Sequence, residues 1–185
     1  MIKLKTSKVL YERAKTHGKL RNAESKTYKS NCEKTVMSDM IGCYGEIMVA
    51  SHLGNNDYIP THIFKKNNPD ITFPTSNVSV EVRTIIYNHN RPLEENNKTD
   101  RTHVNYIHGD LLVRESDDDT SAVVLVEYVD QNNLYLVGWA IAGHVKSTQT
   151  KTMISDISAY GYWVKRQLLL PIESLNWYVF TLHGK

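Results

Sequence analysis

Apolar residues recur at helical spacing between residues 34 and 53, and this pattern predicts a helix that stops at Leu53 and Gly54. The side away from the apolar stripe is also small and apolar, except for Asp39 and Glu46. A second face of this kind indicates that another element packs there, so we expect Glu46 to lie against a neighbour; the alternative is a glutamate exposed to solvent. The stripe consists of Val36, Met37, Met40, Ile41, Tyr44, Ile47 and Met48.

Apolar and polar residues alternate in the segment "DITFPTSNVSVEVR", residues 70–83, and this alternation predicts a β-hairpin. Successive side chains of a strand point to opposite faces, so one face of the second strand is apolar and the other is polar. The apolar face must belong to the core. It carries Val78, Val80 and Val82, and the polar face carries Ser79, Glu81 and Arg83.

A tight turn at Thr75 and Ser76 would set Asp70 opposite Glu81, with Cβ atoms about 4.5–5.5 Å apart. Two carboxylates at that distance repel each other unless a cation or a raised pKa removes the conflict. Mg²⁺ would suit this position, because it binds one or two carboxylates together with water and phosphate oxygens, and Glu46 could serve as a third acid. The alternative is a register slip of one residue, which would put the acids on opposite faces of an ordinary exposed hairpin.

Other segments predict further helices and strands around this hairpin. Residues 5–17 are typical of a basic helix that ends near Gly18. Residues 87–109 are polar, Asn-rich and aperiodic, as in a long loop. Three or more β segments between helices indicate an α/β or α+β class. The remaining predicted elements are a short strand around residues 58–64, strands at 121–129 and 134–140, and a helix at about 141–147.

Composition favours one globular domain over residues 1–185, since 41% of the residues are apolar and 23% are charged. We divide it into a basic helical arm, residues 1–33, and a core, residues 34–180. No apolar run approaches the roughly 20 residues of a membrane span, and the N-terminus lacks the apolar stretch of a signal peptide, so we expect a cytoplasmic protein without membrane contact. Cys32 and Cys43 match no disulfide or zinc pattern.

Charge is distributed unevenly along the chain. Residues 1–35 contain ten Lys or Arg and three Glu, a net charge of +7, although the whole chain carries only +2. This asymmetry favours an anionic partner, nucleic acid before membrane, because the segment lacks a strong apolar face with aromatic anchors. The alternative is a solvated basic helix that aids solubility. The predicted nucleic-acid contacts are Lys8, Arg13, Lys15, Lys19 and Arg21.

Three short motifs, in this order, resemble those of the PD-(D/E)XK nuclease superfamily. They are "GCYGEIMVASHLG" at residues 42–54, "PD" at residues 69–70 and "VEVR" at residues 80–83. Later segments are similar to members of this superfamily as well, so that the resemblance spans residues 36–175. It implies a restriction-endonuclease-like core, in which a central mixed β-sheet is flanked by helices.

The resemblance also implies an activity, the hydrolysis of phosphodiester bonds in DNA by a Mg²⁺-dependent endonuclease, with Mn²⁺ as a substitute. Asp70 and Glu81 would bind the metal, and Glu46 would support the metal or its water. Arg83 stands where the superfamily has Lys. Arginine can hold a phosphate oxygen through two hydrogen bonds, but it stays protonated and cannot act as a general base. The attacking hydroxide would then come from water activated by the metal.

Other interpretations stay open. Arg83 at the Lys position also suits a catalytically inactive nucleic-acid-binding protein on the same fold. An aromatic C-terminus points to a structural or interaction protein, although we expect these side chains in the core or at a homodimer interface. They are Tyr160, Tyr162, Trp163, Trp177 and Tyr178.

Two further clusters of metal-ligating residue types match no known ligand spacing. The first cluster, three histidines and an aspartate, suggests a histidine-based metal nuclease. The spacing of these residues along the chain matches no tight ligand pattern and favours ordinary loop residues. The acidic run at residues 117–119 lacks the glycine and the terminal Glu of a calcium loop, and a solvated turn before a strand is predicted there. The four residues of the first cluster are His89, His103, His108 and Asp110.

Overall fold

The computed structural model describes residues 1–25, 36–60, 69–86, 110–154 and 159–182. No helix within these ranges is long and apolar enough to cross a membrane. In chain order the elements are β1 (Ile2–Lys3), α1 (Lys8–Ser25), α2 (Val36–His52), β2 (Val80–Ile86), β3 (Leu111–Arg114), β4 (Ala122–Asp130), β5 (Asn133–Ile141), α4 (Ala142–Thr148), β6 (Lys151–Ile154), β7 (Ala159–Val164) and α5 (Leu175–Trp177), with short helical turns at Arg166–Leu168, Ile172–Ser174 and Tyr178–Leu182.

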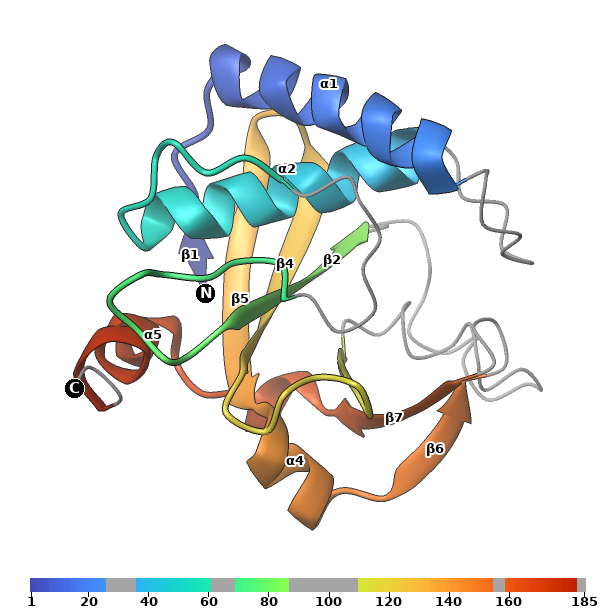
Figure 1. Cartoon of the computed structure of the whole chain (residues 1–185), viewed down its shortest axis with the longest axis vertical. Helices are drawn as coiled ribbons and strands as arrows, with labels where there is room; N and C mark the ends of the chain where they lie inside the picture. Colours follow the sequence, from blue (N-terminus) through green and yellow to red (C-terminus); the bar gives the residue numbers. More distant parts are fainter. Residues whose placement is uncertain (26–35, 61–68, 87–109, 155–158, 183–185) are drawn as a thin grey trace.

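The strands form two sheets (Figure 1). A four-stranded mixed sheet has the order β1-β5-β4-β2, in which β2 runs parallel to β4, and β5 runs antiparallel to both β4 and β1. A three-stranded antiparallel sheet has the order β3-β7-β6. Helices α1 and α2 lie on one side of the mixed sheet, and the smaller sheet lies with α4 on the other. The predicted mixed α/β class, with a mixed sheet flanked by helices, is confirmed.

Strand β4 lies between two apolar clusters and is buried on both faces. Ala122, Val124 and Val126 belong to the main core beneath α2. Val123 and Leu125 belong to a second cluster formed with β3, β7 and α4. A strand covered on both faces needs apolar side chains at successive positions, which accounts for the unbroken apolar run at residues 122–126 of β4.

Four elements agree with their predicted bounds to within two residues at each end: α2, β4, β5 and α4. The predicted stop of α2 is confirmed as well. Gly54 has a φ angle of 89°, which favours glycine, and the amide of Asn55 donates a hydrogen bond to the carbonyl of Ala50. This arrangement is a Schellman cap, and it turns the chain away from the helix axis.

The predicted bounds of the N-terminal helix are wrong, because α1 passes through Gly18 and continues to Ser25. Gly18 marks a close helix–helix contact instead of a helix end. A Cβ atom at this position would lie 2.5 Å from the Cα atom of Met40 on α2. The close approach lets α1 pack along α2, and Leu4 and Ala14 enter the main core. The basic helix is therefore packed against the rest of the fold.

The predicted hairpin has the expected register but forms only one bridge. Ile71 and Val80 exchange two backbone hydrogen bonds of 2.9 Å, and this antiparallel pairing sets Asp70 opposite Glu81. The turn is centred on residues 74–75, one residue earlier than predicted. The register of the pairing, on which the candidate site depends, is confirmed.

The C-terminal aromatic residues divide between core and surface. Tyr162 and Tyr178 are buried, as predicted for core residues. Tyr160 and Trp177 are exposed, and a homodimer interface for them stays a prediction. Of the strand predicted at residues 58–64, residues 58–60 are described and form no strand. Outside the described residues lie the predicted loop at residues 87–109, with His89, His103 and His108, and Cys32.

Candidate functional site

Strand β2 directs two charged side chains away from the main core. Val80 and Val82 are buried in the core beneath α2, so the alternation of the strand turns Glu81 and Arg83 to the other face. Little of either side chain is exposed, 12% for Glu81 and 8% for Arg83. Charged groups at such depth are stable only with charged or hydrogen-bonding partners, and these partners define the site.

Asp70 reaches the same place from the segment that precedes β2. Its register follows from the Ile71–Val80 bridge, and its Oδ2 atom accepts a hydrogen bond of 2.8 Å from the backbone amide of Val82. The Asp70 carboxylate therefore accepts the hydrogen bond that a backbone carbonyl of a neighbouring strand would accept from β2. This hydrogen bond fixes the side chain beside the polar face of β2.

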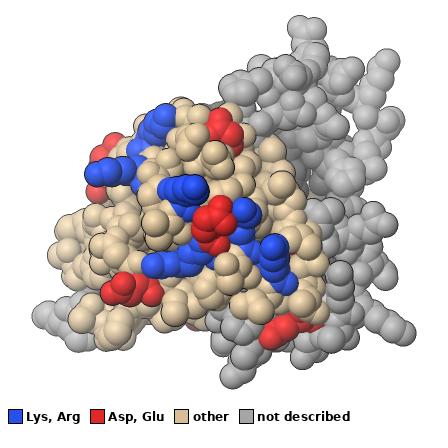
Figure 2. Space-filling view, turned by 90° about the horizontal axis from the view of Figure 1, so that it is seen from above, with Lys and Arg blue, Asp and Glu red and all other residues tan. Residues whose placement is uncertain are grey.

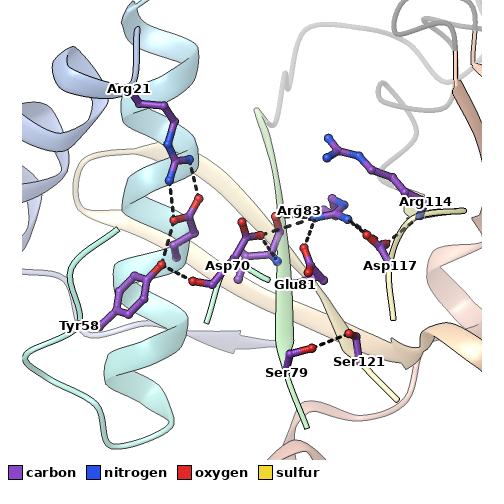
Figure 3. Close-up of polar contacts among 11 residues, drawn as sticks. Arg21, Tyr58, Asp70, Ser79, Glu81, Arg83, Arg114, Asp117 and Ser121 are labelled. Carbon is purple, nitrogen blue, oxygen red and sulfur yellow. Dashed lines mark hydrogen bonds and ion pairs between the residues drawn. The ribbon is translucent and has the colours of Figure 1, made fainter. Parts of the chain in front are cut away.

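Asp70 and Glu81 converge on one nitrogen of Arg83 (Figure 3). Nη1 of Arg83 lies 3.2 Å from Oε2 of Glu81 and 3.6 Å from Oδ2 of Asp70. Facing carboxylates were expected to need a cation or a raised pKa, and both features are present. Arg83 supplies the positive charge, and the pKa of Glu81 is raised to about 7, chiefly by burial and further by the charge of Asp70, while Arg83 opposes the shift.

Asp117 holds the other end of the guanidinium. Nη2 of Arg83 donates to both carboxylate oxygens of Asp117, at 2.7 and 2.8 Å. The backbone amide of Arg114 donates to Oδ2 of Asp117 at 2.8 Å, and the ammonium of Lys146 on α4 donates to the Asp117 carbonyl. Asp117 is buried, so the turn between β3 and β4 is tied to β2 through a buried ion pair.

The prediction of a solvated turn at residues 117–119 is therefore wrong for Asp117. It is correct for the two acids that follow, which are exposed. Asp118 accepts hydrogen bonds from Thr120, and Asp119 pairs with Lys146 at 2.8 Å. Sequence reasoning missed Asp117 because three consecutive acids look alike. The sequence signal that could have pointed to Asp117 was Arg83, since an arginine buried on β2 requires a carboxylate partner.

Glu46 is buried against a neighbouring helix, and the alternative of an exposed glutamate is wrong. Nη1 and Nη2 of Arg21 on α1 donate to its two carboxylate oxygens at 2.6 and 2.8 Å. Tyr58 approaches from the segment after α2, with its hydroxyl 3.1 Å from Oε2 of Glu46 and 2.5 Å from the carbonyl oxygen of Asp70. Glu46 thus reaches the candidate site through Tyr58 and the Asp70 backbone. Figure 3 shows the Tyr58 hydroxyl between Arg21 and Asp70.

The pKa of Glu46 is raised to about 7. Burial is the largest cause and the charge of Asp70 adds to it, whereas the hydrogen bonds and charge of Arg21 act in the opposite direction. The Tyr58 hydroxyl has one proton for two acceptors, so a proton on Glu46 would satisfy the second contact. Glu46 is therefore poised to change its protonation state near neutral pH.

The predicted nucleic-acid contacts all belong to helix α1. Figure 2, which views the molecule from above, shows Lys and Arg side chains gathered on that face with an acidic side chain among them. Lys8 and Lys19 are exposed. Lys15 pairs with Glu12 at 3.1 Å, and the two side chains are 40% and 52% exposed. The exposed part of α1 therefore presents a positive surface that is partly neutralised by Glu12.

The two arginines among those predicted contacts have partners inside the protein. Nη1 of Arg13 donates to the carbonyl oxygens of Asn56 at 3.0 Å and of Tyr58 at 3.4 Å. Arg21, whose side chain is 15% exposed, is engaged by Glu46. Arg13 holds the segment after α2 against α1, and Arg21 holds α2 itself. The charge count did not predict these structural roles.

Asp70 and Glu81, which face one nitrogen of Arg83, are two carboxylates that could hold a divalent cation. Mg²⁺ commonly takes one or two carboxylates and completes its shell with water and phosphate oxygens. No set of three or more His, Cys, Asp or Glu side chains within the described ranges is arranged to hold a metal ion. The carboxylate of Glu46 is held by Arg21 and Tyr58. Because both carboxylates already face one cationic atom, the donor set fits Mg²⁺ or Mn²⁺ if Nη1 of Arg83 gives way.

The raised pKa of Glu46 predicts how stability depends on pH. Between about pH 4.5 and 7 the folded state keeps a proton that the unfolded chain releases, so this group makes the free energy of unfolding fall as pH rises. Glu46→Gln lacks this contribution. From pH 4 to pH 8 we expect the wild type to lose about 3 kcal/mol more unfolding free energy than the variant, measured by urea denaturation. Parallel pH profiles for the two proteins would contradict the assignment.

Comparison with known proteins gives no relative of this chain. No family model, no curated protein and no solved structure matches it. What supports a function is therefore the geometry of the site together with the resemblance of the sequence motifs.

Proposed function

We propose that this chain is a Mg²⁺-dependent endonuclease that hydrolyses phosphodiester bonds in DNA, with its catalytic centre at Asp70, Glu81 and Arg83. The observation that carries the proposal is the convergence of Asp70 and Glu81 on one cationic atom at the edge of β2. Two acids on facing positions, with a basic residue two positions after the second, are the elements that the PD-(D/E)XK resemblance requires. A restriction-endonuclease-like core is part of this proposal.

Each residue of the centre has a role that follows from its chemistry. Asp70 and Glu81 would hold the cation, which when bound supplies Lewis acidity and an activated water. Arg83 stays protonated, so it cannot take a proton from water; it would hold a phosphoryl oxygen and stabilise the charge that develops there. Tyr58, bonded to the Asp70 carbonyl, would keep Asp70 in place, and Glu46 would act through Tyr58.

DNA is proposed as the substrate because of the charge on α1. This helix contains five Lys or Arg and two Glu, and the exposed lysines among them can contact phosphates without reading sequence. Its contacts with α2, and those of Arg21 with Glu46, join this surface to the candidate centre. Contacts of α1 with the DNA phosphates would supply affinity, while Asp70 and Glu81 beside β2 would act on the phosphodiester bond.

A catalytically inactive nucleic-acid-binding protein is the second candidate function. One observation favours it: the guanidinium of Arg83 already neutralises Asp70 and Glu81 at the point where a cation would lie. An internal cation stabilises the fold without any metal. The two candidates differ in whether Mg²⁺ can compete with Arg83 for the acids.

Cleavage assays separate the two candidates. With Mg²⁺ or Mn²⁺ we expect the wild type to cut DNA, and Asp70→Asn and Glu81→Gln to cut about a thousandfold more slowly while binding DNA nearly as well, since each loses a cation ligand worth several kcal/mol in the transition state. Glu173→Gln, which changes an exposed glutamate, is the control and should cut normally. A wild-type protein that binds DNA without cutting it under either metal would favour the inactive binder.

The salt dependence of binding tests the role of α1. Each phosphate contact contributes about 0.9 to the slope of log K against log salt concentration, so Lys8→Gln with Lys19→Gln should make the slope shallower by roughly 2. Lys151→Gln with Lys165→Gln removes the same charge from β6 and from the residue after β7, and should leave the slope unchanged. Equal slopes for all three proteins, measured by fluorescence anisotropy, would remove α1 from the interface.

A further inference from the structure

Arg83 is held unequally by its three carboxylate partners. Its Nη2 atom lies 2.7 and 2.8 Å from the two oxygens of Asp117, whereas its Nη1 atom lies 3.2 Å from Glu81 and 3.6 Å from Asp70. Paired short contacts of a guanidinium with one carboxylate are the strong form of this interaction. The guanidinium is therefore anchored on Asp117 and bound more loosely by the pair that faces it.

Asp117 is also held by groups other than Arg83. Its carboxylate accepts the backbone amide of Arg114, its own amide donates to the Arg114 carbonyl, and Lys146 holds its carbonyl from α4. Only 4% of the Asp117 side chain is exposed. A carboxylate held on several sides at this depth can set the position of the arginine that pairs with it, because the arginine side chain has more rotatable bonds than the aspartate.

Asp117 also sets the net charge around Asp70 and Glu81. Three carboxylates surround one guanidinium, so these four groups carry a net charge of −2 when all are ionised. Without Asp117, the full positive charge of Arg83 would act on Asp70 and Glu81, and the net charge would fall to −1. A divalent cation that approaches the pair competes with that positive charge.

We infer that Asp117 is a positioning residue that draws Arg83 away from Asp70 and Glu81 and so leaves these two acids able to bind a divalent cation. The inference rests on the proposed function, since it assumes that the acid pair takes a metal. During cation binding Nη1 leaves the pair while Nη2 stays on Asp117. Arg83 then remains beside the cation, where it can meet a phosphate oxygen.

The test is the affinity for Mn²⁺, measured by isothermal titration calorimetry without DNA. We expect Asp117→Asn to weaken Mn²⁺ binding at least about tenfold, because one charge acting on a divalent ion over several ångströms is worth that much even in water. Arg83→Gln should tighten binding, since it removes the competing charge. Asp119→Asn is the matched control: it removes the same charge two residues away, from a side chain that is 75% exposed, and should change the affinity less than threefold.

A double variant distinguishes a loss of Mn²⁺ affinity caused by the charge of Arg83 from one caused by unfolding. Asp117→Asn leaves Arg83 without its strongest partner and can destabilise the protein, whereas Arg83→Gln combined with Asp117→Asn removes both charges and restores a net −2. The double variant should recover Mn²⁺ affinity to near the wild-type value, a result that damage to the fold would not give. Circular dichroism spectra of all variants verify that they are folded.

The outcomes separate this inference from the proposed function. Equal Mn²⁺ affinity for the wild type and Asp117→Asn would overturn the role of Asp117 and leave the nuclease proposal untouched. A wild type that binds Mn²⁺ with the expected order of variants, but does not cut DNA, would support the inference and overturn the proposed activity. Absence of Mn²⁺ binding by the wild type would overturn both.

Discussion

The burial of Arg83 among three carboxylates is the interaction on which the candidate site depends. One guanidinium joins Asp70 before β2, Glu81 on β2 and Asp117 in the turn between β3 and β4. Removing one partner of a buried pair leaves a charge without compensation, which typically costs 3–5 kcal/mol. Arg83 therefore allows acids to gather at the edge of the sheet, where without it their mutual repulsion and desolvation would oppose folding. The same positive charge is the competitor that a metal ion must displace.

A second buried pair connects the site to the basic helix. Arg21 of α1 donates two short hydrogen bonds to Glu46 of α2, and the Tyr58 hydroxyl links Glu46 to the backbone carbonyl of Asp70. A shift of α1, for example on contact with an anionic partner, would thus act on the segment that holds Asp70. Because burial raises the pKa of Glu46 to about 7, we expect the charge of this group to change near neutral pH.

Local patterns predicted the part of the site that depends on one hairpin. The alternation of β2 and the turn before it were sufficient to set Asp70 opposite Glu81 and to put Arg83 on the same face, because strand register follows from a pattern of period two. The small second face of α2 correctly indicated a neighbour for Glu46. Partners distant in sequence were not predictable: Asp117 is 34 residues from Arg83, and Arg21 is 25 residues from Glu46. Nothing local distinguishes Asp117 from the two acids beside it, and Gly18 suggested a helix end where the fold required a close helix contact.

Whether Asp70 and Glu81 bind a metal ion is the central question, and diffraction from a crystal soaked in Mn²⁺ answers it most directly. We predict an anomalous peak between the two carboxylates, with Nη1 of Arg83 displaced from them and Nη2 still paired with Asp117. A peak elsewhere, or Arg83 still between the acids at millimolar Mn²⁺ with no peak there, would contradict the metal-dependent site.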